Sequence, residues 1–334
     1  MINGSKMQKK TILEVRDLKT YFNVGTSVVK AVDGVSFDLN AGEITAIVGE
    51  SGSGKSITSL TIMRLLPSNV IDKNRGVIKF NDTNLLNISE NKMREIRGNK
   101  ISMIFQEPMT SLNPVYNLSF QITEVIKLHQ KKNSSESRRL AIEMLDLVGI
   151  PEPQKRIDNY PHELSGGMRQ RAMIAMALCC KPEILIADEP TTALDVTIQA
   201  QILELMQDLQ KKLGMSILFI THDLGVVSEI ADKVIVMYAG QVVETGPAID
   251  IFSNPKMPYT AGLMNSIPKI DNEENKKLKT IPGNVPNPLY LPSGCRFHPR
   301  CEFSEDSCKK ILPSLKEINK ERSVRCSLWK NISL

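Results

Sequence analysis

The stretch Leu164-Ser165-Gly166-Gly167-Met168-Arg169-Gln170-Arg171 is the most informative part of the sequence, because it lies between a phosphate-loop lysine, Lys55, and an acidic strand end at Asp188. Ser165, Gly166 and Gly167 offer a hydroxyl and exposed backbone N–H groups at the start of a predicted helix that runs to about Cys180. A helix start of this kind binds anions. The stretch therefore predicts an anion site in addition to the phosphate loop.

The phosphate loop is Gly49-Glu50-Ser51-Gly52-Ser53-Gly54-Lys55-Ser56, which fits the pattern G-x-x-x-x-G-K-[ST] after an apolar run at 44–48. Its glycines let backbone N–H groups curl round a polyphosphate, and a helix predicted from Ser56 to Leu66 aims its positive end at the same anion. We expect Lys55 to reach the β- and γ-phosphates and Ser56 to ligate Mg²⁺. The residues expected to bind the nucleotide here are Gly49, Ser51, Gly52, Ser53, Gly54, Lys55 and Ser56. An ordinary glycine-rich turn is the alternative.

The run Ile184-Leu185-Ile186-Ala187-Asp188-Glu189-Pro190 reads as a second short strand that ends at Asp188, with Glu189 one residue further into the loop. Asp188 suits a water-mediated hold on Mg²⁺, and Glu189 could polarise an attacking water. The alternative is a solvated acidic turn. With the phosphate loop upstream, the pair predicts hydrolysis of a nucleotide.

These motifs together resemble those of the nucleotide-binding subunits of ABC transporters. Gln106 matches the Q-loop glutamine, Thr192-Ala193-Leu194-Asp195 the D-loop, and Ile220-Thr221-His222-Asp223 the switch-histidine motif. The resemblance implies an α/β fold with an ABC-type P-loop ATPase core, made of a mixed sheet with helices, a small β subdomain and a helical subdomain. It also implies ATP and Mg²⁺ as cofactors, with Gln106 a Mg²⁺ ligand and a catalytic residue.

The same resemblance implies that two subunits pack head to tail, so that the signature of one closes over the ATP of the other. His222 would contact the γ-phosphate, although a hydrogen-bonded structural histidine is the alternative. Asp195 would shape the contact between the two half-sites. Either Tyr21 or Phe22 would stack on adenine.

Length and composition agree with a large domain and a smaller appendage. The chain has 334 residues, 41% of them hydrophobic, and a formal net charge of +5, which argues for neither a nucleic-acid partner nor a strong membrane field. The longest strongly apolar run, Ala172 to Cys180, is too short to span a bilayer, and the polar start of the chain lacks the apolar segment of a secretion signal. We therefore expect a cytoplasmic location.

Strand patterns at Ile12 to Val15, Val35 to Leu39 and Val77 to Phe80 surround the phosphate loop, and further strands are expected at 216–220, 233–238 and 241–244. A helical subdomain is predicted at about 107–165. This interval carries no sustained heptad, unlike the coiled coils of chromosome-organising ATPases of the superfamily. A soluble, non-transport ATPase is therefore the minor hypothesis.

Beyond Glu244 the sequence becomes proline-rich, which predicts domain boundaries at 1–244 and 245–334 and an irregular C-terminal arm over the latter range. The runs 106–114, 254–260 and 294–301 resemble those of ATPases that serve oligopeptide, dipeptide and nickel importers. That resemblance implies a peripheral subunit at the cytoplasmic face of the membrane. Its partners would be a second ATPase subunit, identical or different, two integral membrane permeases and an external solute-binding protein. Peptide is the expected solute and nickel the alternative.

Four of the six cysteines, Cys295, Cys301, Cys308 and Cys326, lie in the C-terminal arm. Cytoplasmic thiols stay reduced, so disulfides are not expected, and four thiolates in a poorly cored segment suggest a metal centre. The resemblance to these importer ATPases implies a [4Fe–4S] cluster, with Zn²⁺ as the closest alternative and free thiols as the third. His298 is expected to pack or hydrogen-bond near the centre, and replacement of one ligand by its ring is the alternative.

Overall fold

The computed structural model describes residues 10–67, 71–106, 111–192, 195–267 and 280–334. Ala193 and Leu194 of the expected D-loop, and residues 107–110 of the run after Gln106, lie outside the described residues. The chain forms two compact units, one of Met1–Asn87 with Ile220–Leu334 and one of Ile88–Phe219. The first unit thus combines the two ends of the chain.

The two units have the following elements, and the boundary at Phe219 falls inside β8. The first unit contains β1 (Thr11–Val24), β2 (Ser27–Asn40), β3 (Ile44–Val48), α1 (Lys55–Ile62), β4 (Ile71–Phe80), β5 (Thr83–Asn84), α9 (Leu224–Ile230), β9 (Lys233–Tyr238), β10 (Gln241–Pro247), α10 (Ala248–Ser253), α11 (Pro258–Asn265), η2 (His298–Arg300), α12 (Asp306–Lys310), β11 (Lys316–Asn319) and β12 (Arg322–Val324). The second contains α2 (Glu90–Ile96), β6 (Ile101–Ile104), α4 (Leu118–Gln130), α5 (Ser134–Leu147), α6 (Pro153–Arg156), η1 (Pro161–Glu163), α7 (Gly166–Leu178), β7 (Ile184–Asp188), α8 (Val196–Leu213) and β8 (Ser216–Thr221).

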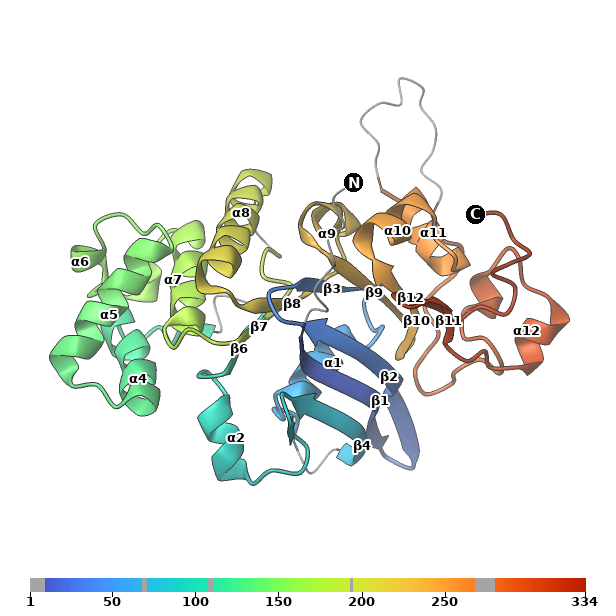
Figure 1. Cartoon of the computed structure of the whole chain (residues 1–334), viewed down its shortest axis with the longest axis horizontal. Helices are drawn as coiled ribbons and strands as arrows, with labels where there is room; N and C mark the ends of the chain where they lie inside the picture. The colour runs from blue at the N-terminus through green and yellow to red at the C-terminus, as the bar shows by residue number, and fades with distance from the viewer. Residues whose placement is uncertain (1–9, 68–70, 107–110, 193–194, 268–279) are drawn as a thin grey trace, which may run out of the picture. The chain divides into compact units, whose positions relative to one another are not determined.

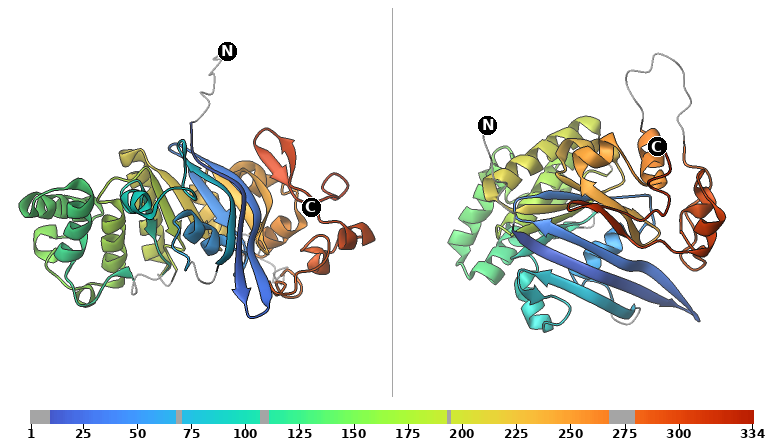
Figure 2. Two further views of the ribbon diagram at one scale, coloured as in Figure 1. Left: turned by 90° about the horizontal axis from the view of Figure 1, so that it is seen from below. Right: turned by 45° about the vertical axis from the view of Figure 1, so that its right-hand side comes forward.

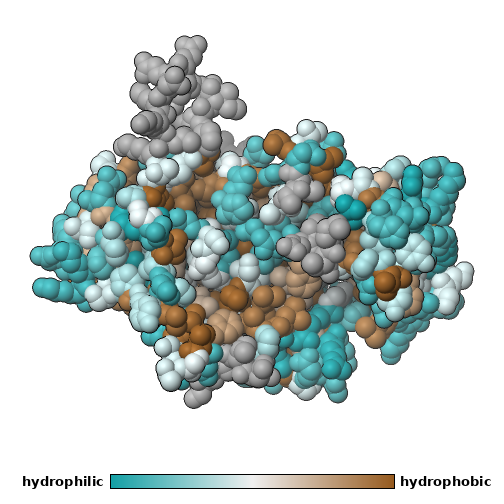
Figure 3. Space-filling model, turned by 180° about the vertical axis from the view of Figure 1, so that it is seen from behind, coloured by the Kyte–Doolittle hydropathy of each residue, from teal (hydrophilic) through white to brown (hydrophobic). Residues whose placement is uncertain are grey.

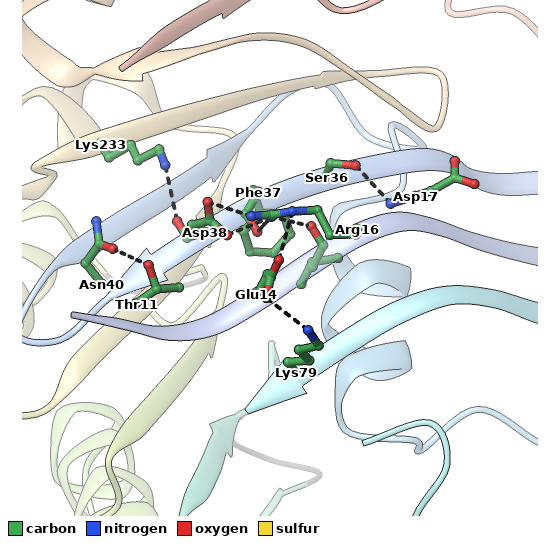
Figure 4. A network of polar contacts seen from close by, with 11 residues as sticks. Thr11, Glu14, Arg16, Asp17, Ser36, Phe37, Asp38, Asn40, Lys79 and Lys233 are labelled. Carbon is green, nitrogen blue, oxygen red and sulfur yellow. Dashed lines mark hydrogen bonds and ion pairs between the residues drawn. The ribbon is translucent and has the colours of Figure 1, made fainter. Parts of the chain in front are cut away.

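A small antiparallel sheet of order β2-β1-β4-β5 lies in the first unit. Its three long strands run side by side in Figures 1 and 2, and a polar network fastens them (Figure 4). Arg16 of β1 pairs with Asp38 of β2 at 2.7 Å and with Glu14 at 3.1 Å. Lys233 of β9 donates to the Asp38 carbonyl at 3.2 Å, so the network also reaches the larger sheet. The predicted small β subdomain is present.

The larger sheet of the first unit has the order β11-β12-β10-β9-β3, in which β3 runs parallel to β9 and the other pairs are antiparallel. β3 and β9 are almost entirely buried, as expected of parallel strands covered on both faces. The C-terminal arm contributes β11 and β12 to this sheet. The arm therefore extends the sheet that contains β3 and β9.

The C-terminal arm also supplies side chains to the core of the first unit. Tyr259 and Phe297 of the arm and Val324 of β12 are buried in one cluster with Val48 of β3 and Tyr238 of β9. The rings of Tyr238, Tyr259 and Phe297 pack with centroids 4.6 to 5.3 Å apart. Aromatic burial of this size stabilises the docked arm.

In the second unit, β6 and β7 pair in parallel, with Ile101 opposite Ile184 and Ile104 opposite Ala187. Helices α4, α5 and α7 contact one another, and Asn117 and Asn133 cap the first two of them by accepting from Phe120 and Glu136. Helices are thus present in the interval where the sequence predicts a helical subdomain.

In the described part of the chain, no helix is both long enough and apolar enough to cross a bilayer. The face drawn in Figure 3 carries apolar residues in patches among hydrophilic ones.

Candidate functional site

The phosphate loop connects β3 to α1, in the order that the sequence predicts. Gly49 has φ +150° and Gly54 has φ +101°. A Cβ atom on Gly49 would lie 2.2 Å from the Met237 carbonyl oxygen, and one on Gly54 would lie 2.5 Å from the Ala31 carbonyl oxygen. Both positions therefore require glycine on grounds of space as well as backbone conformation.

Lys55 and Ser53 present polar atoms to the interior of this loop. The Lys55 side chain is buried and its Nζ donates to the carbonyl oxygens of Gly49 at 2.7 Å and Glu50 at 3.1 Å. Ser53 Oγ is buried without a hydrogen-bond partner among the described residues. A buried cation and an unsatisfied hydroxyl at the start of α1, where Ser56 is the second helical residue, fit a phosphate group.

The two aromatic candidates for the adenine, Tyr21 and Phe22, are neighbours in β1 and both are half-buried. Tyr21 donates its hydroxyl to Asp33 at 2.5 Å. Burial and this bond to Asp33 raise the pKa of Tyr21, so the hydroxyl stays protonated at neutral pH. The Tyr21 hydroxyl is therefore already hydrogen-bonded to Asp33.

Glu189 lies directly after β7 in the second unit, with a left-handed φ of +47° that is unusual outside glycine. Its Oε2 accepts from Gln106 Nε2 at 2.9 Å and from Thr192 Oγ1 at 3.1 Å. The structure therefore brings together two of the predicted catalytic residues. Strained backbone at such a position marks a functional-site candidate.

The remaining predicted residues are positioned at the ends of strands and helices. Asp188 is the buried last residue of β7, and His222 is exposed just after β8. Ser165 caps α7 by accepting from the Met168 backbone N–H at 3.3 Å, and its neighbours Gly166 and Gly167 open that helix. Asp195 caps α8 by accepting from the Ile198 backbone N–H at 2.9 Å.

The four cysteines Cys295, Cys301, Cys308 and Cys326 line one cavity of the C-terminal arm together with apolar side chains such as Phe297 and Leu328. Burial raises the pKa of Cys301 and of Cys326 to about 11, and charge on the neighbouring thiols adds to each shift. The sequence places these cysteines far apart, and the fold gathers them.

Within the described residues, however, no group of three or more His, Cys, Asp or Glu side chains has the arrangement that holds a metal ion. The described residues therefore do not support the metal centre that the sequence led us to expect. His298 turns its Nδ1 to the Cys295 carbonyl oxygen at 2.9 Å, which gives that ring a partner within the loop.

Sequence reasoning missed two arginines that connect the C-terminal arm to the rest of the first unit, one of them through the phosphate loop. Arg300, next to Cys301, pairs with Glu50, and Arg296, next to Cys295, pairs with Asp33 and donates to the Ala239 carbonyl oxygen. Their position beside cysteines is the one signal that singles them out.

Comparison with known proteins gives two family matches. Residues 32–192 match the model described as "ABC transporter", and residues 243–308 match the model described as "Oligopeptide/dipeptide transporter, C-terminal region".

Two curated relatives and one solved structure are similar over most of the chain. The oligopeptide transport ATP-binding protein AppD of Bacillus subtilis is 56% identical over 96% of this chain and 97% of its own length. The dipeptide transport ATP-binding protein DppD of Escherichia coli is 49% identical over 94% and 96%. The dimeric, ADP- and phosphate-bound structure of the ATP-binding cassette MJ0796 superposes with a TM-score of 0.63 at 26% identity, covering 71% of this chain and 98% of that one.

Proposed function

We propose a function from one premise, which is that this chain belongs to the family of ABC transporter ATP-binding proteins. The chain is an ATPase of that family. We infer that it binds and hydrolyses ATP to power an ABC importer of dipeptides or oligopeptides. The observation that carries the proposal is the phosphate loop, with Lys55 and the unsatisfied Ser53 hydroxyl gathered beside the first turn of α1.

The residues of the second unit support a role in hydrolysis. Gln106 and Thr192 fix the Glu189 carboxylate in one direction, so it is available to accept a proton from an attacking water. The side-chain oxygens of Asp188, Ser56 and Gln106 are the kind of ligand that Mg²⁺ prefers. Mg²⁺, when bound, would neutralise charge on the phosphates. His222 is proposed to contact the γ-phosphate.

The proposed assembly is a pair of ATPase subunits, two permeases and an external binding protein. Ser165 and the α7 N-terminus support the pairing, since they form an anion site separate in sequence from the phosphate loop. A solved structure similar to this chain is described as dimeric. Asp195 would shape the contact between subunits, and Tyr21 or Phe22 would stack on adenine. The second subunit is either another copy or a different ATPase, and the complex would lie at the cytoplasmic face of the membrane.

The peptide assignment rests on the C-terminal arm and on relatives. Residues 243–308 match the C-terminal region of oligopeptide and dipeptide transporters, and the relatives AppD and DppD carry peptide transport in their names. Nickel is the alternative solute.

We propose that the four cysteines hold an iron–sulfur cluster. A [4Fe–4S] cluster needs four thiolates around a volume larger than one ion, in apolar surroundings. The observation behind this proposal is that the four thiols line one apolar cavity. Zn²⁺ remains the alternative. When bound, the cluster would supply a structural cross-link to the C-terminal arm, and the raised pKa values of Cys301 and Cys326 mean that binding must displace protons.

The test is purification of the tagged full chain from its native membrane, followed by reconstitution of the recovered complex in liposomes with its external binding protein. We expect two integral membrane proteins to co-purify, and alanine tripeptide to stimulate ATP hydrolysis when NiCl₂ does not. Stimulation by NiCl₂ alone would establish the nickel alternative. Recovery with ribosomes or DNA would refute transport.

A matched pair of lysine variants controls this experiment. Lys55→Ala removes the buried cation of the phosphate loop and should abolish hydrolysis. Lys211→Ala removes an exposed lysine from the last turn of α8 and should leave hydrolysis unchanged.

A further inference from the structure

We propose that Arg300 of the C-terminal arm neutralises the Glu50 carboxylate of the phosphate loop, and that ATP affinity therefore depends on the docked arm. The inference rests on the proposed function, because it assumes that the phosphate loop binds ATP. It deepens that function by assigning part of the nucleotide site to the arm.

Arg300 forms a bidentate ion pair with Glu50. Its Nη1 lies 2.8 Å from Glu50 Oε2 and its Nη2 lies 3.0 Å from Glu50 Oε1. The Arg300 side chain is only 5% exposed and its Nε donates to the Pro282 carbonyl oxygen at 2.9 Å. Arg300 Nη1 also lies 3.4 Å from the Tyr238 hydroxyl, so Pro282 and Tyr238 together hold the planar guanidinium beside the Glu50 carboxylate.

The C-terminal arm holds the backbone of Glu50 as well as its side chain. The Glu50 N–H donates to the Tyr259 hydroxyl at 2.9 Å. The Glu50 carbonyl oxygen in turn accepts from Lys55 Nζ at 3.1 Å. The N–H, the carbonyl and the carboxylate of one loop residue are therefore all engaged, two of them by the arm and one by the phosphate-binding lysine.

Arg300 also has an electrostatic effect on the loop. Its charge is matched by Glu50, so it does not add a free cation for the phosphates. Without Arg300, the Glu50 carboxylate would stand unneutralised in a loop that must accept ATP, and like charges there oppose binding. A contact that only docks the arm would not respond to the Glu50 charge, whereas charge neutralisation predicts that removing the Glu50 charge as well restores binding.

The four-cysteine segment adds a reason why this contact matters. Arg300 immediately precedes Cys301, and Gly294, immediately before Cys295, has no room for a Cβ because the Cys308 carbonyl oxygen would lie 2.3 Å away. The segment that carries Arg300 is thus closely packed. A change in its conformation must move Arg300 and with it Glu50.

The experiment measures the dissociation constant of MgATP for the full chain by isothermal titration calorimetry. We expect Arg300→Gln to weaken binding about tenfold and Arg300→Lys to weaken it less, because one charge-assisted bond survives. The variant Glu50→Gln should bind at least as tightly as the unaltered chain. The double variant should recover to within about threefold of it.

The matched control is Arg138→Gln, which breaks the bidentate pair that Arg138 of α5 makes with Asp158 at 2.6 to 2.7 Å. It should leave MgATP affinity unchanged. Equal affinity of Arg300→Gln and Arg138→Gln would overturn the inference. So would a double variant as weak as Arg300→Gln, which would make the pair a docking contact only.

Failure of the proposed function gives a different result. In that case the unaltered chain would not bind MgATP, or Lys55→Ala would bind MgATP as tightly as the unaltered chain does. If Arg300→Gln does not fold, Arg300→Lys and Glu50→Gln still decide the inference: a weakened lysine variant supports it, and a glutamine variant at Glu50 that loses affinity overturns it.

Discussion

Glu244 offers the sharpest test of how the C-terminal arm is attached. This residue of β10 is fully buried, and its carboxylate accepts from the backbone N–H groups of Lys256 at 2.8 Å and Met257 at 3.1 Å and from Arg322 at 2.8 Å. We expect Glu244→Gln to destabilise the first unit by about 3–5 kcal/mol, because it leaves the buried Arg322 charge without a counter-ion. The substitution preserves volume, so no cavity contributes.

The assay is urea unfolding at neutral pH followed with two probes. The single tryptophan, Trp329, packs against the core cluster and its fluorescence reports on the C-terminal arm, whereas far-UV circular dichroism reports on the whole chain. We expect the fluorescence transition of Glu244→Gln to move to lower urea and to precede the circular dichroism transition. Two units need not unfold together, so the probes are analysed separately.

The matched control is Glu143→Gln. Glu143 pairs with Arg139 at 2.5 Å on α5, but both side chains are more than half exposed. Such a surface pair is worth about 0.3–0.5 kcal/mol. A loss below about 1 kcal/mol for Glu244→Gln, or one equal to that of Glu143→Gln, would refute the assignment of Glu244 as the anchor of the arm.

Three further outcomes are expected. Glu189→Gln should bind MgATP normally but hydrolyse it about a hundredfold more slowly or worse, and undiminished turnover in the assembled complex would remove Glu189 from its role. Protein purified without oxygen should hold about four irons and four acid-labile sulfides per chain, and Cys326→Ser should lose them while Cys180→Ser keeps them; one zinc and no iron would replace the cluster with a zinc site. Asp33→Asn should destabilise the chain at pH 7 and progressively less below about pH 4. Burial alone would raise the pKa of Asp33, but the Tyr21 hydroxyl and Arg296 outweigh it and hold that pKa below its usual range, so the stabilisation exists above the unfolded pKa and is lost as the pH falls. Urea midpoints of both proteins at pH 7 and pH 3.5 measure this, and a constant difference would contradict the reasoning.

Much of the nucleotide site follows from local sequence because its chemistry is local. The strand Ile44–Val48 is observed at its predicted bounds, since five consecutive buried residues followed by a glycine-rich turn leave little choice. The helix after it ends at Ile62, earlier than the predicted Leu66, because Arg64 adopts a left-handed conformation with φ +51°. Capping by Ser165 agrees with the helix start that the sequence predicts there.

Contacts between distant parts of the sequence were not predictable in the same way. β1 extends to Val24, well past the predicted Val15, because pairing with β2 and β4 continues where apolar alternation has faded. Arg300 meets Glu50 across 250 residues of sequence, and no periodicity encodes such a pair. The prolines of the C-terminal arm indicated irregular backbone. They gave no sign that Tyr259 and Phe297 are buried in the core of the first unit.

The first unit is made from the two ends of the chain, and this has a consequence for biosynthesis. When the ribosome has released residues up to 87, β3 and the phosphate loop are present, but the buried strand β9 and the aromatic residues that cover it are not. The apolar side chains of β3 cannot be fully buried until the rest of the chain, with Val324 near its end, has emerged. The second unit, a continuous segment, has no such delay within itself. Nascent chains of this protein should therefore acquire protease resistance in residues 88–219 first, and gain nucleotide binding only when synthesis is nearly complete.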